Sequence, residues 1–374
     1  MRGAQGQFGA IRFPQIAWRA VLLGLTVSSV SRAQAQVVRG EVIDSLAARP
    51  VSAAIVVLVD SADQERARAL TDAAGRFAIK ADTPGRYRLR TLVVGYRRWE
   101  SGFIALERGQ SVERRITLGL VPVALPVLTV EAERTCVVRP EAGLAAAALW
   151  EEVRKTLGVT QLTLDRRRYR FATVVHTTEF DRNRALQSES SQRDLDYTAF
   201  GFGSLDAAEL RDRGFVRNDA GGPIYYGPDA RLLVSDVFLD GHCFRVERTR
   251  QPGVIGLAFE PVGDQSKPDI EGALWLDSAT VSLVGLEWRY TAQPRWARDG
   301  DPGGSMEFAQ LPNGAWFVRR WTLRAPIARV IAGRADTLLH GTKVREGLVV
   351  EVLTAGGDVV VRFDSAGAVL RQRH

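Results

Sequence analysis

The residues best spaced for metal chemistry are His176-Thr-Thr-Glu179. With His242 or His340 as a third ligand, they would match the two-histidine, one-glutamate set of zinc peptidases. The local pattern opposes this interpretation, because residues 168–176 alternate as in a β-strand and strand residues three apart point to opposite faces. We therefore expect no metal site, no cofactor and no catalytic residue here.

Nucleophilic catalysis also lacks its usual sequence patterns. The chain contains no His-Glu-x-x-His, Gly-x-Ser-x-Gly or Gly-x-x-x-x-Gly-Lys. His242 directly precedes Cys243, and adjacent residues of a regular strand face opposite ways, which separates this base from this thiol. Only four histidines are present, and one of them is the last residue, His374. We therefore expect a non-catalytic protein.

Residues 1–35 have the organisation of a secretory signal peptide. An apolar run at 20–30 follows a basic start, and Ala33-Gln34-Ala35 has the small-x-small form that signal peptidase cleaves. A membrane-spanning helix needs about 20 apolar residues, and no later stretch approaches that length. We expect the mature chain to begin at Gln36, to have no transmembrane segment, and to be periplasmic or associated with the outer membrane.

Export changes the interpretation of Cys136 and Cys243, the two cysteines of the chain. Because thiols oxidise outside the cytoplasm and neither residue lies in a Cys-x-x-Cys pattern, we expect a structural disulfide between them. Two separate buried thiols are the alternative. A bond that closes a loop of about 108 residues stabilises a fold by up to roughly 4.7 kcal/mol in chain-entropy terms.

The net charge of +7 does not indicate nucleic-acid binding. Residues 1–35 contribute four arginines and no acid, so 4 of the 7 charges leave with them and +3 remains. So small an excess on a chain of this size lacks the basic surface that nucleic acid requires. With 374 residues, 45% of them hydrophobic, the chain is long enough for about two globular domains.

Residues 37–118 have the pattern of a domain of short β-strands. Inside one strand–turn–strand unit, Asp72 can close the turn through its side chain and Gly75 can adopt a positive φ. The spacing of five or more strands favours a β-sandwich. The strand patterns lie at 37–43, 53–59, 69–79, 87–91 and 111–118.

Several motifs in this domain together resemble the carboxypeptidase regulatory-like family: Gly40-x-Val42, Thr71-Asp72-Ala73-x-Gly75-x-Phe77, Pro84-Gly85-x-Tyr87-x-Leu89, and Gly95-Tyr96. The resemblance implies a transthyretin-like (prealbumin-like) sandwich that accompanies another domain and is not itself a catalyst. Domains of this family occur beside metallocarboxypeptidases, in starch-binding-like modules and at the N-terminus of TonB-dependent receptors. This company makes carbohydrate a candidate ligand.

Residues 119–139 are the expected linker, because Pro122 and Pro126 disfavour a regular strand. We expect few contacts between the domains on its two sides. A helix is predicted over roughly 141–157, with Gly158 at its end.

Residues 140–374 are expected to form an antiparallel β domain with this helix at its N-terminal end. The segment 200–230 should be mostly loop, with one helical turn near 205–213. The predicted fold class is mainly β: an N-terminal transthyretin-like β-sandwich plus a C-terminal curved antiparallel sheet with one main α-helix. The strand patterns of the second domain lie at 168–176, 231–239, 281–290, 305–309 and 316–323.

The order of Glu271–Asp277, Leu286–Tyr290 and Pro312-Asn-Gly-x-Trp316 resembles the later strands of LolA/LolB-type lipoprotein-sorting proteins. In that family a curved sheet wraps a helix and leaves an apolar concavity. The N-terminal sandwich, the candidate disulfide and the long insertion at 200–230 depart from the family pattern, and these departures put lipoprotein carriage in doubt.

Five tryptophans lie between residues 275 and 321: Trp275, Trp288, Trp296, Trp316 and Trp321. They either fill a sheet core or line a concavity for an acyl chain or a sugar ring. Trp316 and Trp321 have opposite parity, so on a regular strand only one of them points into a given cavity. Trp296 lies in an expected loop and should be the most exposed of the five.

The predicted function is non-catalytic binding, in the envelope, of an amphiphile or a partner protein. A carbohydrate ligand is the alternative, and a metallocarboxypeptidase-like or other hydrolase is the third hypothesis.

Overall fold

The computed structural model describes residues 36–119, 145–219, 222–248, 252–263, 266–330, 337–364 and 369–370. The predicted signal peptide, the linker from residue 120 onward and Cys136 lie outside these ranges. Within them, no helix combines the length and the apolar character needed to cross a membrane. The predicted fold class, mainly β with few helices, is confirmed.

Two sheets form the N-terminal domain, one with strand order β4-β1-β8 and one with order β3-β2-β5-β6, to which β7 adds beside β5. β1 runs antiparallel to β4 and parallel to β8. Alternate side chains, such as Phe77 and Ile79 of β4, point into a core that also contains Val38, Leu58 and Leu89. The bounds are β1 Gln36–Asp44, β2 Ile55–Asp60, β3 Glu65–Leu70, β4 Arg76–Ala81, β5 Gly85–Leu92, β6 Trp99–Glu100, β7 Ile104–Leu106 and β8 Ser111–Leu118.

The turn between β3 and β4 has the predicted chemistry. Oδ1 of Asp72 accepts hydrogen bonds from the backbone N–H groups of Ala74 and Arg76, each at 2.9 Å. Gly75 has φ +72°, and a Cβ at this position would lie 2.6 Å from the Val42 carbonyl oxygen. Only glycine fits this turn without strain.

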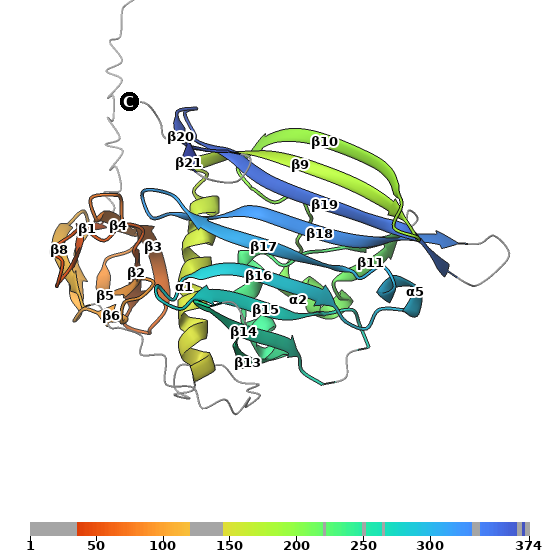
Figure 1. The fold of residues 1–374 in the computed structure, drawn as a ribbon. Helices are drawn as coiled ribbons and strands as arrows, with labels where there is room; N and C mark the ends of the chain where they lie inside the picture. Colours follow the sequence, from red (N-terminus) through yellow and green to blue (C-terminus); the bar gives the residue numbers. More distant parts are fainter. Residues whose placement is uncertain are drawn as a thin grey trace, which may run out of the picture. The chain divides into compact units, whose positions relative to one another are not determined.

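The second domain is built on an antiparallel sheet of 11 strands, with the order β10-β9-β19-β18-β17-β16-β15-β14-β13, with β20 added beside β19 and β21 beside β20 (Figure 1). Strands β13 to β19 follow one another in sequence and in space, and the β9–β10 hairpin extends the sheet beyond β19. The bounds are β9 Tyr169–Asp181, β10 Leu186–Asp196, β13 His242–Arg248, β14 Val254–Pro261, β15 Ile270–Asp277, β16 Leu283–Tyr290, β17 Gly303–Gln310, β18 Trp316–Val330, β19 Thr337–Thr354, β20 Val359–Phe363 and β21 Val369–Leu370.

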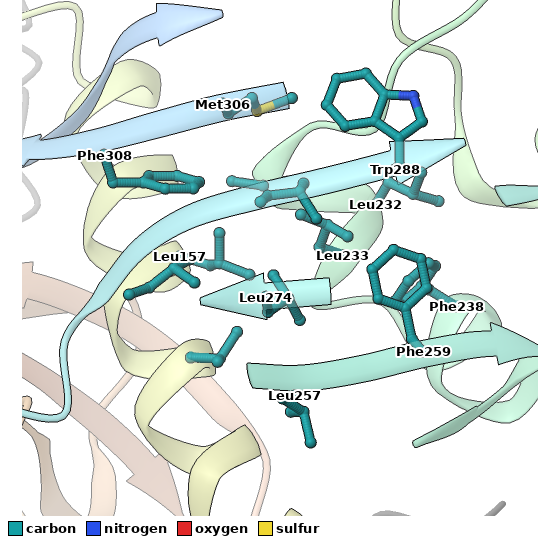
Figure 2. Close-up of a cluster of buried hydrophobic side chains, with 14 of the residues drawn as sticks. Leu157, Leu232, Leu233, Phe238, Leu257, Phe259, Leu274, Trp288, Met306 and Phe308 are labelled. Carbon is teal, nitrogen blue, oxygen red and sulfur yellow. The ribbon is translucent and has the colours of Figure 1, made fainter. Parts of the chain in front are cut away.

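Helices pack on this sheet around one large apolar cluster. Figure 2 shows Leu157 of the longest helix and Leu232, Leu233 and Phe238 of two short helices meeting sheet side chains such as Leu274. Side chains therefore fill the space between helices and sheet. The helices are α1 Ala145–Asp165, α2 Ala207–Arg213, α3 Ala230–Leu233, α4 Asp236–Gly241 and α5 Arg295–Arg298, and a small hairpin joins β11 Val216–Asp219 to β12 Gly222–Tyr225.

The predicted end of the main helix at Gly158 is wrong, because α1 continues to Asp165. A Cβ at Gly158 would lie 3.1 Å from Cδ1 of Ile55 on β2. The glycine thus serves close packing rather than helix termination. Glycine inside a helix costs about 1 kcal/mol relative to alanine.

The strand predicted at 231–239 is also wrong, since α3 and α4 occupy this segment. The side chain of Asp229 accepts a hydrogen bond from the Leu232 N–H at 2.8 Å, and that of Ser235 accepts one from the Phe238 N–H at 3.2 Å. These two N-caps favour helix over an apolar run that alone suggests a strand. The helical turn predicted near 205–213 is confirmed as α2.

Trp316 and Trp321 share one face, because the strand that carries them is not the regular strand for which opposite faces are expected. Both are buried in the same apolar cluster, with exposed fractions of 8% and 0%. The β17–β18 register shifts between Glu307 and Phe308, which leaves Arg319 as the extra residue of a β-bulge. A bulge reverses the alternation of side chains, so residues of opposite parity share a face.

The described residues from Gln36 onward belong to one compact unit, in which α1 packs against the sandwich. Ile55, Val57 and Val59 of β2 belong to the same apolar cluster as the α1 side chains. Alternate residues of β2, Val56 and Leu58, belong to the sandwich core instead. β2 is therefore buried on both faces.

A buried ion pair reinforces this contact. Glu152 and Lys155 lie one turn apart on α1, their side chains are 6% and 5% exposed, and Oε1 and Nζ are 2.6 Å apart. Oε2 of Glu152 accepts the Gly95 N–H at 2.9 Å, and Nζ of Lys155 donates to the Tyr96 carbonyl oxygen at 2.8 Å. The Gly95-Tyr96 motif of the sandwich thus hydrogen-bonds to both charges.

Candidate functional site

The candidate zinc ligands occupy unrelated environments. His176 is exposed on β9, and Glu179 forms an ion pair with Lys343 at 2.7 Å. His242 is buried, with its ring nitrogens 2.9 Å and 3.1 Å from the carbonyl oxygens of Phe238 and Ile270. Among the described residues, no group of three or more His, Cys, Asp and Glu side chains could hold a metal ion.

Cys243 lies on β13 and is 1% exposed. Its predicted partner, Cys136, lies outside the described residues. The disulfide therefore stays a prediction.

The tryptophan cluster divides between core and surface. Trp288, Trp316 and Trp321 are core residues of the second domain. Trp275 and Trp296 are half-buried, and Trp296 belongs to α5 rather than to a loop.

A groove of about 420 Å³, which we call the first groove, lies where the β9–β10 turn meets β18, β19 and the segment after α5. Its size falls in the range of about 300–1,000 Å³ that small-molecule sites occupy. Phe180, Leu339 and Val344 supply apolar side chains, and Arg182, Arg184 and Arg324 supply guanidinium groups.

Two of the carboxylates that line the first groove already have bonding partners. Asp301 forms an ion pair with Arg324. Oδ1 of Asp181 accepts the N–H groups of Asn183 and Ala185, each at 2.8 Å, and so shapes the turn that carries Arg182 and Arg184. Neither of these two arginines forms an ion pair with another described residue. Asp299 is the remaining carboxylate of the groove.

A second groove, of about 620 Å³, lies between the end of α1, residues 196–200 and the start of α3. Tyr197 and Phe200 present aromatic rings, and the Arg167 guanidinium lies 5.5 Å from the centre of the Tyr197 ring. Asp165 accepts a hydrogen bond from Gln161 at 2.6 Å and forms an ion pair with Arg231 at 3.2 Å. We call this the second groove.

Neither groove could be predicted from the sequence, because each joins segments far apart in the chain. One local signal was available for the contact between the domains. The run Ala53-Ala-Ile-Val-Val-Leu-Val59 is apolar without alternation, which is typical of a strand buried on both faces.

Comparison with known families decides the identity of the sandwich. Residues 37–119 match the carboxypeptidase regulatory-like domain. The N-terminal resemblance is therefore confirmed, over 83 of the 374 residues. The similarity of the C-terminal half to LolA/LolB-type proteins is not shown. No curated protein matches the chain.

Several solved structures are similar over most of the chain, at low identity. The TIE protein of Bacillus anthracis is 7% identical with a TM-score of 0.21, and the match covers 82% of this chain and 48% of that one. A 9R-lipoxygenase from Cyanothece PCC8801 is 11% identical with a TM-score of 0.18, covering 84% and 42%. The chain thus spans about half the length of these two proteins.

BcpA, the major pilin subunit of Bacillus cereus, is 11% identical with a TM-score of 0.20, and the match covers 91% of this chain and 92% of that one. TM-scores at this level establish no shared fold, so the functions of these proteins are not transferred.

Proposed function

We propose that this protein is an exported, non-catalytic binding protein of the cell envelope, and that its C-terminal domain holds an amphiphile with an anionic head group in the first groove. One observation carries the proposal. The groove places the apolar side chains of Phe180, Leu339 and Val344 beside Arg182 and Arg184, neither of which forms an ion pair with a described carboxylate.

These two kinds of side chain suit the two ends of such a ligand. The guanidinium group presents a planar set of donors that matches a carboxylate or phosphate in two parallel hydrogen bonds. Each buried methylene of an acyl chain adds about 0.8 kcal/mol of favourable transfer free energy. A head group at Arg182 and Arg184 would place the chain against Phe180 and Leu339.

Replacing both arginines should weaken binding of an anionic amphiphile. For dodecanoate, the Arg182→Ala/Arg184→Ala variant should have a dissociation constant at least about tenfold higher than the wild type, because it loses two charge-assisted contacts. Binding is measured by isothermal titration calorimetry, with dodecanol as the uncharged ligand.

The matched control is Arg211→Ala/Arg213→Ala, which removes two exposed arginines with the same spacing from α2. This control should bind dodecanoate as the wild type does. Equal loss in both double variants would show that only net charge matters and would contradict the site. A protein retained from the periplasm in native mass spectrometry, in place of a small molecule, would favour a partner protein instead.

Export is the second part of the proposal, and the signal peptide pattern of residues 1–35 supports it. Protein recovered from a periplasmic fraction should begin at Gln36 in N-terminal sequencing, because cleavage follows Ala33-Gln34-Ala35. Met1 at the N-terminus of exported protein would contradict this part.

Carbohydrate is the second candidate ligand, favoured by the aromatic and hydrogen-bonding side chains of the second groove. Sugar rings stack on aromatic faces such as Tyr197, and their hydroxyls suit carboxylate and guanidinium partners such as Asp165 and Arg231. If a maltooligosaccharide binds the Arg182→Ala/Arg184→Ala variant but not the Tyr197→Ala variant, the result would favour a carbohydrate over an amphiphile as the ligand. Stoichiometric zinc with peptidase activity in the purified protein would overturn the non-catalytic proposal.

A further inference from the structure

Strand β10 forms one edge of the large sheet and pairs on one side only, with β9 (Figure 1). All 11 of its residues are exposed. Along this strand, alternate residues direct their backbone N–H and C=O groups away from β9, where no other described strand pairs with them. Such an edge is a template for pairing with another chain.

Some of the features that commonly protect an edge are absent from β10, although four of its 11 residues are charged. Its sequence, Leu-Gln-Ser-Glu-Ser-Ser-Gln-Arg-Asp-Leu-Asp, contains no proline and no lysine. Its one register shift lies between Leu186 and Ser188, at the hairpin end. From Ser188 to Asp196 the strand pairs regularly with β9 and can offer a regular outer edge.

A second copy of this chain is the partner that the edge fits, because Glu189 and Arg193 can pair reciprocally, while Asp194 and Asp196 then face uncharged residues. Two identical antiparallel strands pair around a two-fold axis. Residues whose hydrogen-bonding groups point outward have one parity, so the axis must pass through a residue and not between two residues. With the axis at Ser191, Glu189 lies opposite Arg193 of the second copy, and this pair occurs twice.

The neighbouring registers lack this complementarity. An axis at Glu189 or at Arg193 would place two like charges directly opposite each other, which is destabilising. An axis at Ser190 or Gln192 would pair Glu189 with an uncharged residue, Ser191 or Leu195. The charges therefore select one register from the five central ones.

Arg193 has hydrogen-bonding capacity for this contact. Its side chain is 62% exposed, and its guanidinium reaches Glu351 at 3.2 Å. Glu351 is also bound by Arg362 at 2.6 Å, so it has a second cationic partner. To face Glu189 of the second copy, the Arg193 side chain turns outward from Glu351, which lies on β19 beyond β9, and Glu351 keeps Arg362 as its partner.

We propose that two copies of this chain associate through antiparallel pairing of their β10 strands, with Ser191 on the two-fold axis. The inference does not depend on the groove or its ligand. The dimer joins two large sheets edge to edge, and it should weaken as salt screens the two exposed Glu189–Arg193 pairs.

Two charge reversals test the register. In Glu189→Arg, each pair becomes arginine opposite arginine, and in Arg193→Glu it becomes glutamate opposite glutamate. Each variant alone should show a dimer dissociation constant at least about tenfold above the wild type, because two attractive pairs become repulsive. Sedimentation equilibrium on the full mature chain measures this change.

Mixing the two variants gives the decisive measurement. In the heterodimer, both charged positions of the Glu189→Arg copy carry arginine and both positions of the Arg193→Glu copy carry glutamate, so each arginine faces a glutamate. An equimolar mixture should therefore dimerise with an affinity near that of the wild type. Glu307→Arg is the matched control, because Glu307 is an exposed carboxylate on β17, in the interior of the sheet. It should leave the dimer unchanged.

Three results would overturn the proposal: a wild type that is monomeric into the millimolar range, a dimer that neither reversal weakens, or a mixture that remains monomeric. Circular dichroism checks that both variants keep their strand content. Recovery in the mixture also shows that the variants are folded, because unfolded chains would not restore each other.

Discussion

Replacing Glu152 with alanine should lower the free energy of unfolding by about 3–5 kcal/mol, which is the range for removing one member of a buried ion pair. Glu152 and Lys155 are almost completely buried on α1. The variant leaves the Lys155 ammonium without its carboxylate and the Gly95 N–H without its acceptor. An unpaired charge and an unsatisfied donor would then remain in a region from which water is excluded.

The effect should be local to the contact between α1 and the sandwich. The Lys155 ammonium donates a hydrogen bond to the Tyr96 carbonyl oxygen, and the Tyr96 hydroxyl donates a 2.6 Å hydrogen bond to Asp44. That bond lowers the pKa of the Asp44 carboxyl, and burial raises the pKa of the Tyr96 hydroxyl. Hydrogen exchange at the Gly95 amide should therefore accelerate strongly in the variant.

The same helix supplies a matched control. Glu151 and Arg154 have the same spacing and a distance of 2.8 Å, but their side chains are 23% and 36% exposed. Glu151→Ala should cost at most about 1 kcal/mol, because water solvates the charge that remains. Urea unfolding followed by fluorescence compares the two variants. Equal losses would mean that the Glu152–Lys155 pair does not hold the domains together.

The parts of the fold that could be predicted from sequence are those with a local chemical cause. The turn at Asp72 and Gly75 is one, since a side-chain acceptor and a positive φ determine its conformation. The alternating strands of the sandwich are another, because one face of each meets the core. These local features also carry the family resemblance that the comparison confirmed.

The sequence-based predictions were wrong where a contact with a residue distant in the sequence determines the local structure. A glycine that follows an apolar helical run is typical of a helix end, but Gly158 packs against Ile55 of the sandwich. The bulge at Arg319 reverses the alternation between Trp316 and Trp321, and no local pattern marks it. The sequence could not predict β10 as a strand. Both of its faces are exposed, so its sequence lacks the alternation of apolar and polar residues that indicates a strand.

The first groove could not be predicted from the sequence for a related reason. Its residues come from the end of β9, the segment after α5, β18 and β19, and these are brought together by sheet order. Phe180 and Val344 have no distinctive sequence context, and Arg182 is one arginine among many. Only the antiparallel pairing of β9 with β19 places these residues in one groove.

Trp321→Ala should destabilise the second domain by about 3–5 kcal/mol, as large-to-alanine changes at buried aromatic residues do. Trp321 is 0% exposed, and its Nε1 donates a 2.8 Å hydrogen bond to the Ala199 carbonyl. Two glycines make room for the ring: a Cβ would lie 2.3 Å from it at Gly201 and 2.1 Å from it at Gly347. Backbone on both sides therefore closes on this indole, and little of the cavity can collapse.

Trp296→Ala is the control, because Trp296 is half-buried on α5 and lies outside the main cluster. It should cost less than about half as much, in proportion to the smaller apolar area that it buries. Trp321 also anchors residues 199–202, and Phe200 of this segment lines the second groove. Thermal unfolding compares the two variants. A Trp321→Ala midpoint no lower than that of Trp296→Ala would contradict the assignment of Trp321 as the support that joins this segment to the sheet.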